Sequence, residues 1–400
     1  MIKREKIMYI DNRPELGIVV DWDLVQKNFN KIVPPSIRKK YHNPLLPHPE
    51  KYSYYMDISD RDRGKTTNKL IVGLILFAMY GIQTVYMRTK SDDVERRNIS
   101  TLYEIVLEYN YIQKIFGEEW NAIDYSSYRW TICNVDDAGK IVQKMPDFCT
   151  FCMATERAMR YKSRLVLPNA DYIIYDEFIE PDYPFYTMQY FQQNLKTVLR
   201  SRKTGVILMS SNAINLNSPW FADFKIRKRV KNLKIGEHAE IEVDGTTFYV
   251  DILDADTRAE KKQYNAKYLG FAGGKTMQSI TGGNVWEMSQ YPHIKKSFVI
   301  KTTYARNIYV SHLGDLLNIE ITNIENIGLC GLVKPATRLY DDSIIFTVGE
   351  ILDSRYVYRC GNSKSPVSLV WRLYRENRLF YANNECGELL KNYYATAQKL

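Results

Sequence analysis

The sequence predicts an α/β protein, with a parallel sheet in a large first domain and a smaller second domain near the C-terminus. Between about residues 51 and 225, short strand-like runs alternate with helix-like runs, which is typical of parallel sheets covered by helices. After residue 285 the runs become mainly strand-like before a final helix-like segment. The 400 residues suffice for two to three domains at roughly 150 residues each.

Two segments fit neither pattern. Residues 1–50 are rich in Pro, Asn and Lys, which predicts an extended N-terminal arm or an oligomer contact. Residues 226–284 carry two short β-like pieces, a charged stretch and a Gly-rich loop, so we expect a linker region there. The predicted domains are therefore 51–225 and 285–400.

The strands are predicted from short apolar or aromatic runs, and the longest helix from the longest apolar run, which is too short to span a bilayer. In the first domain we expect strands at Tyr52–Met56, Thr84–Met87, Trp130–Val135, Tyr172–Tyr175 and Val206–Met209, and a helix over Leu70–Met79. The β-like pieces of the linker are Ala239–Val243 and Thr247–Ile252. In the second domain we expect strands at Phe298–Thr303, Asn307–His312, Leu316–Ile321 and Ile344–Val348, then the runs Trp371–Tyr374 and Leu379–Phe380 and a helix over Glu388–Lys399.

A phosphate-binding loop is predicted between the first strand and the long helix. The loop ends in Arg63-Gly64-Lys65-Thr66, in the strand–turn–helix context in which P-loops occur. Backbone N–H groups at the helix N-terminus would surround a phosphate, Lys65 would reach the β- and γ-phosphates, and the Thr66 hydroxyl would bind Mg²⁺. Ser59 stands where the motif has its leading glycine. The competing interpretation is a basic turn before a buried helix.

A second Gly-Lys-Thr sequence occurs at Gly274-Lys275-Thr276. The residues that follow it, including Gly282 and Gly283, suit a turn and not a helix. We therefore expect this copy to be an ordinary loop.

An acidic pair follows the fourth predicted strand. Asp176 and Glu177 come directly after Tyr172–Tyr175. Carboxylates at the end of a buried strand are costly unless they bind a cation, so Asp176 is expected to hold Mg²⁺ and Glu177 to polarise an attacking water. The alternative is an acidic pair that caps a helix.

The fifth predicted strand ends in Ser210-Ser211-Asn212. A polar Asn212 at this strand tip would suit a sensor of the γ-phosphate. The order of the three features along the chain is stronger evidence for a nucleoside triphosphatase than any one of them.

Composition limits the partners. The net charge of +9 favours a polyanionic partner, and a basic run between Lys225 and Lys234, including Lys228 and Arg229, is either a contact for nucleic-acid phosphates or a solvated helix end. The N-terminus has no apolar signal segment. Cys149 and Cys152 form a lone C-x-x-C without further ligands nearby, so we expect reduced, buried or incidental cysteines and no zinc.

The acids of the second domain could in principle form a two-metal nuclease site. They show no spacing that selects a cluster, and surface carboxylates are the favoured interpretation. The acids are Asp315, Glu320, Asp341, Asp342, Glu350 and Asp353.

The chain resembles the DNA-packaging ATPases, or encapsidation proteins, of small protein-primed tailed phages, which are terminase-like motors. The resemblance is firm over about 51–225 and continues in order to the C-terminus. The segments that carry it are Tyr86-Met87-Arg88-x-Lys90, Asp171–Ile179, Val198–Arg202, Ser211-Asn212-Ala213 and Asn217-x-Pro219-x-Phe221.

This resemblance implies an ASCE-type P-loop ATPase that uses ATP and Mg²⁺. It implies a ring of subunits, five by analogy, at the portal of an empty procapsid in the host cell cytoplasm, where the ring drives double-stranded DNA inward. A packaging RNA is a further implied partner. The C-terminal domain would be RNase H-like and generally without the catalytic acids of a terminase nuclease.

The resemblance also implies roles for individual residues. Ser59, Arg63, Gly64, Lys65 and Thr66 correspond to the P-loop, Asp176 to the Mg²⁺ ligand, Glu177 to the catalytic base and Asn212 to the sensor. Arg200 corresponds to an arginine that acts on the neighbouring subunit's nucleotide, with Arg202 as the near alternative, and Lys162 is a second candidate for action in trans. Lys90 corresponds to a DNA contact.

Two other functions remain open at this stage. One is a large terminase with an active C-terminal nuclease. The other is a non-enzymatic, DNA-binding structural subunit, for which Ser59 in the loop is the main argument.

Overall fold

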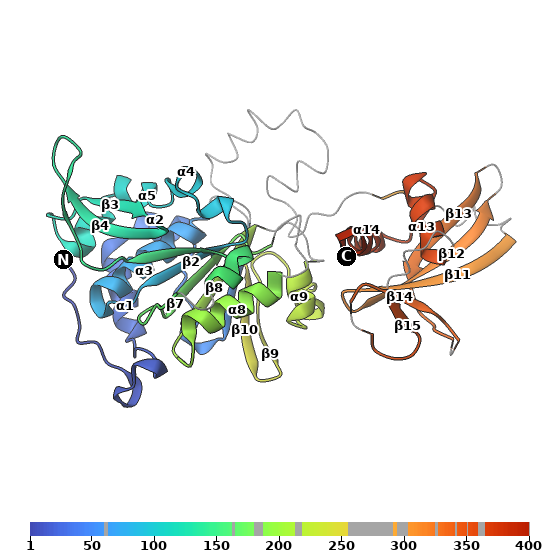
Figure 1. Cartoon of the computed structure of the whole chain (residues 1–400), viewed down its shortest axis with the longest axis horizontal. Coiled ribbons are helices and arrows are strands. Elements are labelled where there is room, and N and C mark those ends of the chain that lie inside the picture. Colours follow the sequence, from blue (N-terminus) through green and yellow to red (C-terminus); the bar gives the residue numbers. More distant parts are fainter. Residues whose placement is uncertain are drawn as a thin grey trace. The chain divides into compact units, whose positions relative to one another are not determined.

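The computed structural model describes residues 1–59, 63–161, 165–179, 187–212, 218–254, 291–293, 303–324, 327–340, 342–349, 351–358 and 365–399. The chain divides into two compact units (Figure 1). Unit 1 comprises Met1–Ile214 and Lys228–Val285, and unit 2 comprises Asn215–Arg227 and Trp286–Leu400.

Unit 1 is built on one large sheet with the strand order β3-β4-β6-β2-β7-β8-β1-β10-β9, and β5 pairs with β4. The strands from β6 to β10 in this order pair with one another in parallel, which confirms the predicted parallel α/β sheet. The strands outside this stretch, β3, β4, β5 and β9, pair antiparallel. The strands are β1 (Tyr54–Ser59), β2 (Thr84–Arg88), β3 (Ala122–Ser126), β4 (Arg129–Val135), β5 (Ile141–Lys144), β6 (Thr150–Ala154), β7 (Tyr172–Asp176), β8 (Val206–Asn212), β9 (His238–Val243) and β10 (Thr246–Ile252). The helices are α1 (Trp22–Ile32), α2 (Pro35–Lys40), α3 (Lys65–Tyr80), α4 (Arg96–Ile99), α5 (Glu104–Glu108), α6 (Tyr111–Phe116), α7 (Ala158–Tyr161) and α8 (Thr187–Leu199).

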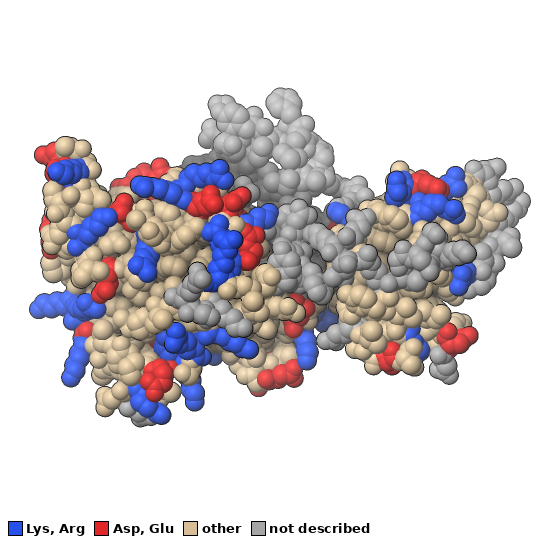
Figure 2. All heavy atoms as spheres, viewed as in Figure 1, with Lys and Arg blue, Asp and Glu red and all other residues tan. Residues whose placement is uncertain are grey.

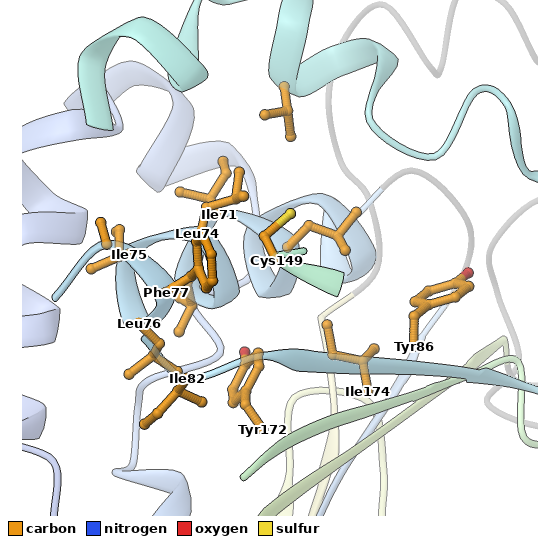
Figure 3. Packing of buried hydrophobic residues seen from close by; sticks show 14 of the residues in the cluster. Ile71, Leu74, Ile75, Leu76, Phe77, Ile82, Tyr86, Cys149, Tyr172 and Ile174 are labelled. Atoms are coloured by element: carbon orange, nitrogen blue, oxygen red, sulfur yellow. The ribbon is translucent and has the colours of Figure 1, made fainter. Parts of the chain in front are cut away.

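Helices cover both faces of this sheet. Along β7, Tyr172 and Ile174 point to the side of α3, where they join its apolar residues in one core cluster (Figure 3). Tyr175 points to the opposite side and stacks on Phe191 of α8, with 5.1 Å between ring centroids. Because successive side chains of a strand alternate between faces, β7 is buried on both sides and reads as a continuous apolar run.

The helix α3 is buried around its whole circumference from Leu70 to Tyr80. It ends at Gly81, whose φ of 70° allows the N–H to bond the Phe77 carbonyl, a common helix stop. One side of α3 packs on the sheet, and its outer side packs on α1, α5 and α6. A helix that is apolar all round needs such a second cover.

Residues 1–50, expected to be an extended arm or an oligomer contact, belong to unit 1 and pack in part on its core. Trp22, Val25, Phe29 and Ile32 of α1 are buried in the core cluster that contains α3. Farther along, the Ile18 N–H donates to Asp171 Oδ2 at 3.1 Å. The apolar outer side of α3 requires this cover, so the N-terminal segment is part of unit 1.

The segment expected to be a linker also differs from the prediction. Its β-like pieces form β9 and β10, and β10 lies parallel to β1 with Met56 opposite Val250. Phe248 and Val250 are buried there. The sheet of unit 1 therefore continues past residue 225, while Asn215–Arg227 belongs to unit 2.

Unit 2 has a six-stranded sheet in the order β15-β14-β11-β12-β13-β16. The first three strands along the chain form an antiparallel meander, and β14 and β15 add in parallel beside β11, which is the strand arrangement of an RNase H-like sheet. The strands are β11 (Thr303–His312), β12 (Asp315–Ile324), β13 (Gly328–Pro335), β14 (Ile345–Thr347), β15 (Tyr356–Tyr358) and β16 (Leu379–Tyr381), and the helices are α9 (Pro219–Asp223), α13 (Pro366–Arg375) and α14 (Asn384–Lys399). A further helix, α10 (Arg227–Val230), spans the boundary with unit 1. The run Trp371–Tyr374 is part of α13, and most of the strand expected at Phe298–Thr303 lies outside the described residues.

Candidate nucleotide site

The predicted P-loop joins β1 to α3. Ser59 ends β1, Gly64 has a left-handed φ of 67°, and Lys65 is the first residue of α3. The Lys65 ammonium donates to Ser59 Oγ at 2.6 Å, so the residue that replaces the leading glycine holds the lysine of the motif. The other copy, Gly274-Lys275-Thr276, lies outside the described residues.

The acidic pair lies beside this loop. Asp176 is the last residue of β7 and is buried. The Thr66 hydroxyl donates to Asp176 Oδ2 at 3.0 Å, and the Tyr86 hydroxyl donates to the same oxygen at 2.8 Å. Burial, and then the nearby Asp176 carboxylate, raises the pKa of Tyr86 well above its usual value, so this hydroxyl stays a donor. The two residues predicted to bind Mg²⁺ are thus within hydrogen-bond distance of each other.

Glu177 has a backbone conformation that side chains rarely adopt. Its φ is 53°, in the left-handed region, directly after the strand. Arg88, at the end of β2, donates to Glu177 Oε2 at 2.6 Å, and its other terminal nitrogen lies 3.6 Å from Asp176 Oδ2. Strained backbone of this kind persists where the surrounding contacts over-determine it, and it is common at functional sites.

Arg88 is the residue that the site prediction missed. The sequence placed it with Lys90 in one of the runs that carry the resemblance, but not beside the acidic pair. The signal for it was the pairing of β2 with β7, with Met87 opposite Tyr175, which brings the ends of the two strands together. That pairing joins residues far apart in sequence and could not be read from local patterns.

The order of the strands completes the site. β8 stands between β1 and β7, with Asn212 opposite Ser59 and Ser210 opposite Asp176. A strand inserted between the P-loop strand and the acidic strand is the arrangement of ASCE-type P-loop ATPases. Because carboxyl ends of parallel strands share one edge of the sheet, the loop, the acidic pair and Asn212 face the same space.

That space is a cavity of about 550 Å³. Its polar lining includes Arg63, Lys65, Thr66, Asp176, Glu177 and Asn212. The size lies in the range of small-molecule sites in proteins.

A buried polar network lies beneath the loop. The Lys69 ammonium donates to Asp57 Oδ1 and Oδ2 at 2.7 and 2.6 Å and also to Ser210 Oγ. His42 Nε2 lies 3.3 Å from Asp57 Oδ2. Burial alone would raise the pKa of Asp57, but Lys69 and then His42 hold that pKa well below its usual value. The network ties β1, α3, β8 and the N-terminal segment together under the cavity.

The two arginines proposed for action in trans have different surroundings. Arg200 follows α8, is exposed and does not line the cavity. Arg202 is buried, where its guanidinium pairs with Asp171 and donates to the backbone oxygens of Ala170 at 3.0 Å and Val198 at 2.6 Å. This structural role of Arg202 favours Arg200 for contact with a neighbour. Lys162 lies outside the described residues.

The residues proposed to contact DNA are at the surface. Lys90 follows β2, and Lys228 and Arg229 are exposed in α10. On the face shown in Figure 2, lysines and arginines are interspersed with acids and form no continuous basic surface.

Three of the C-terminal acids have basic partners. Asp315 pairs with Arg227, Glu320 with Lys334 at 2.6 Å and Asp353 with Arg355 at 2.7 Å. Asp341 and Glu350 lie outside the described residues. Among the residues that the structure describes, no group of three or more His, Cys, Asp or Glu could hold a metal ion.

The C-x-x-C cysteines are buried, as predicted. Burial raises the pKa of the Cys149 thiol to about 12 and raises that of Cys152 still further. Both are free thiols. In the described part of the chain, no helix is both long and apolar enough to cross a membrane.

Comparisons with solved structures find the same fold in phage packaging motors. The Phi-28 gp11 DNA packaging motor has a TM-score of 0.52 and 16% identity, and the match covers 90% of this chain and 98% of that one. The chain has the fold of this motor. The bacteriophage Phi-29 viral genome packaging motor assembly gives a TM-score of 0.51 at 16% identity, over 90% of this chain and 99% of the other. No family model and no curated protein matches the sequence. The resemblance stated from the sequence is thus confirmed at the level of the fold.

Proposed function

We propose that this chain is an ATPase that drives double-stranded DNA into a viral procapsid as a ring of identical subunits. The observation that carries the proposal is the meeting of Lys65, Thr66, Asp176, Glu177 and Asn212 at one cavity. Two phage DNA-packaging motors with the same fold support the cellular role.

The donors fit nucleotide and Mg²⁺. Hydroxyl and carboxylate oxygens are the ligands that Mg²⁺ prefers, and Thr66 and Asp176 supply one of each within 3.0 Å. A bound Mg²⁺ would neutralise charge on the phosphate oxygens. Lys65, released from Ser59, would bind the β- and γ-phosphates, and the N–H groups at the start of α3 would bind the phosphate oxygens.

Glu177 is proposed to orient the attacking water. Its carboxylate is half-exposed at the cavity and held by Arg88, so it is positioned without being enclosed. Asn212, the last residue of β8, would contact the γ-phosphate and act as its sensor. Arg200 would complete the site of the adjacent subunit and neutralise charge on the transferring phosphoryl group.

DNA contacts are proposed for Lys90, Lys228 and Arg229. A motor must accept any sequence, so phosphate contacts should dominate, and the affinity for DNA should fall steeply with salt. A procapsid portal and a packaging RNA are proposed partners, and the host cytoplasm is the proposed location.

The test is ATP hydrolysis by the native chain with and without double-stranded DNA, beside Lys65→Ala and Arg200→Ala. DNA should stimulate the native chain, and both variants should be inactive. Mixing the two variants should restore part of the activity, because a Lys65→Ala subunit can lend Arg200 to a neighbour whose own P-loop is intact. A native chain that binds no ATP, even with DNA and procapsids, would instead support the structural subunit, and Mg²⁺-dependent nicking of plasmid would support the nuclease.

A further inference from the structure

The cavity has two chemically different ends. Its polar groups come from the P-loop and from the tips of β7 and β8. Its apolar groups come from α3 itself and from α2, α5, α6 and the residues directly after α2 and α5, and they are Ile37, Tyr41, Ile71, Ile105, Tyr109 and Tyr111. Triphosphate and metal account for the polar end but leave the apolar end without a ligand.

Two residues at the apolar end are unusually exposed for their type. Ile105 is 48% exposed and Tyr109 is 43% exposed, although both line a cavity. The Tyr109 ring stacks on that of Tyr111, with 5.9 Å between centroids and 18° between planes. Exposed apolar side chains that line a concave site next to polar groups are typical of ligand-binding surfaces.

Tyr41 also lines the cavity, and it comes from the N-terminal segment. It follows α2 and packs so closely on Gly64 that a Cβ there would lie 2.8 Å from the tyrosine. Three contacts of the next residue, His42, hold Tyr41 in this position. The His42 N–H donates to the Arg63 oxygen at 3.0 Å, its carbonyl accepts from Asn68 Nδ2 at 2.5 Å, and its ring lies 3.3 Å from Asp57.

We propose that the apolar end is the slot for the base of the nucleoside triphosphate, with Tyr41 and Tyr109 as its aromatic walls. The slot rests on the proposed ATPase function and deepens it. A base is flat and has a π-face that stacks on tyrosine regardless of its identity. Tyr41 packs on Gly64 at the start of α3, where the phosphates would bind, and both sets of residues line one cavity, so one nucleotide could contact both. The first fifty residues thus complete the nucleotide site.

The test separates the base from the phosphates by using two ligands. The affinities of a non-hydrolysable ATP analogue and of inorganic tripolyphosphate, each with Mg²⁺, are measured by calorimetry. The proteins are the native chain, Tyr41→Ala, Tyr109→Ala and Tyr41→Phe. The matched control is Tyr358→Ala, because Tyr358 is 44% exposed, close to the 43% of Tyr109, belongs to unit 2 and is not among the residues that line the cavity.

The slot predicts that each alanine variant in the cavity raises the Kd of the ATP analogue about five- to 150-fold, the range for removal of one base-stacking side chain. The Kd of tripolyphosphate should not change, and Tyr41→Phe and Tyr358→Ala should match the native chain with both ligands. Tyr109 is exposed and is not part of the core clusters found among the described residues, so its variant tests the slot even if Tyr41→Ala fails to fold.

Three results would overturn the slot. Equal weakening of both ligands would mean that the tyrosines act on the P-loop and not on the base. An unchanged affinity of Tyr109→Ala for the ATP analogue would mean that Tyr109 does not stack on the base. Equal affinity of the native chain for the two ligands would mean that the base contributes nothing to binding. If the native chain bound neither ligand, the proposed ATPase function itself would fall, and the slot with it.

Discussion

Replacing Lys69 with methionine would test how the buried network supports the nucleotide site. Lys69 and Asp57 are both 0% exposed, and the ammonium lies 2.7 and 2.6 Å from the two carboxylate oxygens. Methionine keeps most of the volume and removes the charge. Asp57 would then be a buried carboxylate without its nearest cation, next to the His42 ring at 3.3 Å and with Lys65 still acting on it.

The expected cost follows from this burial. Removing one partner of a buried ion pair usually costs about 3–5 kcal/mol, because the other charge is left without compensation. A pair of nearly equal length at the surface provides the control. Lys144 lies 2.7 Å from Asp124, with side chains 43% and 22% exposed, and such pairs contribute at most about 1 kcal/mol.

The assay is urea unfolding of the native chain, Lys69→Met and Lys144→Met, followed by pulsed hydrogen exchange of peptides from β1. This readout reports unit 1 alone, which matters because a chain of two units need not unfold in one step. Adding Asp57→Asn to Lys69→Met should recover part of the loss, since it removes the stranded charge. Equal losses in Lys69→Met and Lys144→Met, or a further loss on adding Asp57→Asn, would refute the reasoning.

Three other predictions concern the same region. Gly64→Ala should weaken ATP binding and destabilise unit 1 by about 1 kcal/mol or more, because the φ of 67° is left-handed and Tyr41 would lie 2.8 Å from the new Cβ. An ATP affinity measured by calorimetry and a stability measured by urea unfolding that both match the native chain would count against this. The pKa of Asp57 is lower in the folded chain than in the unfolded chain, so the stability that its carboxylate contributes is complete above the unfolded value of about 3.9 and is lost as the pH falls through the folded value. In urea unfolding from pH 7 downward, the native chain should therefore lose its stability advantage over Asp57→Asn only in acid. A loss of that advantage between pH 7 and 5 would contradict this. Arg88→Met should lower the kcat of ATP hydrolysis by up to about a hundredfold, with a smaller effect on ATP affinity, because Glu177 loses the contact that positions it. An unchanged kcat would show that the contact is incidental.

The sequence predicted the parts of the site that are encoded locally. Lys65 and Thr66 begin a helix that follows a strand, and Asp176 and Glu177 stand at the end of a buried strand, of which Asp176 is the last residue. Each of these patterns is a run of neighbouring residues in which strand, turn and function coincide. Asn212 was found in the same way, from the polar tip of an apolar run.

Long-range partners were not predictable in this way. β10 pairs with β1 from almost two hundred residues away, and its short β-like sequence gave no register or partner. The sequence of α3 is apolar on all sides, which indicates that a second layer covers its outer side; α1 supplies part of that layer. What the sequence did not say is which segment supplies that layer, because Trp22 and Phe29 lie among polar residues.

The measurement that tests the central claim most directly is phosphate release from ATP by the native chain and by Glu177→Gln, with binding of the ATP analogue measured in both. The account predicts that Glu177→Gln binds the analogue as the native chain does but hydrolyses ATP about a hundred- to ten-thousandfold more slowly, the usual effect of losing a general base. Hydrolysis by Glu177→Gln at the native rate would contradict it, because the cavity would then not be the catalytic site.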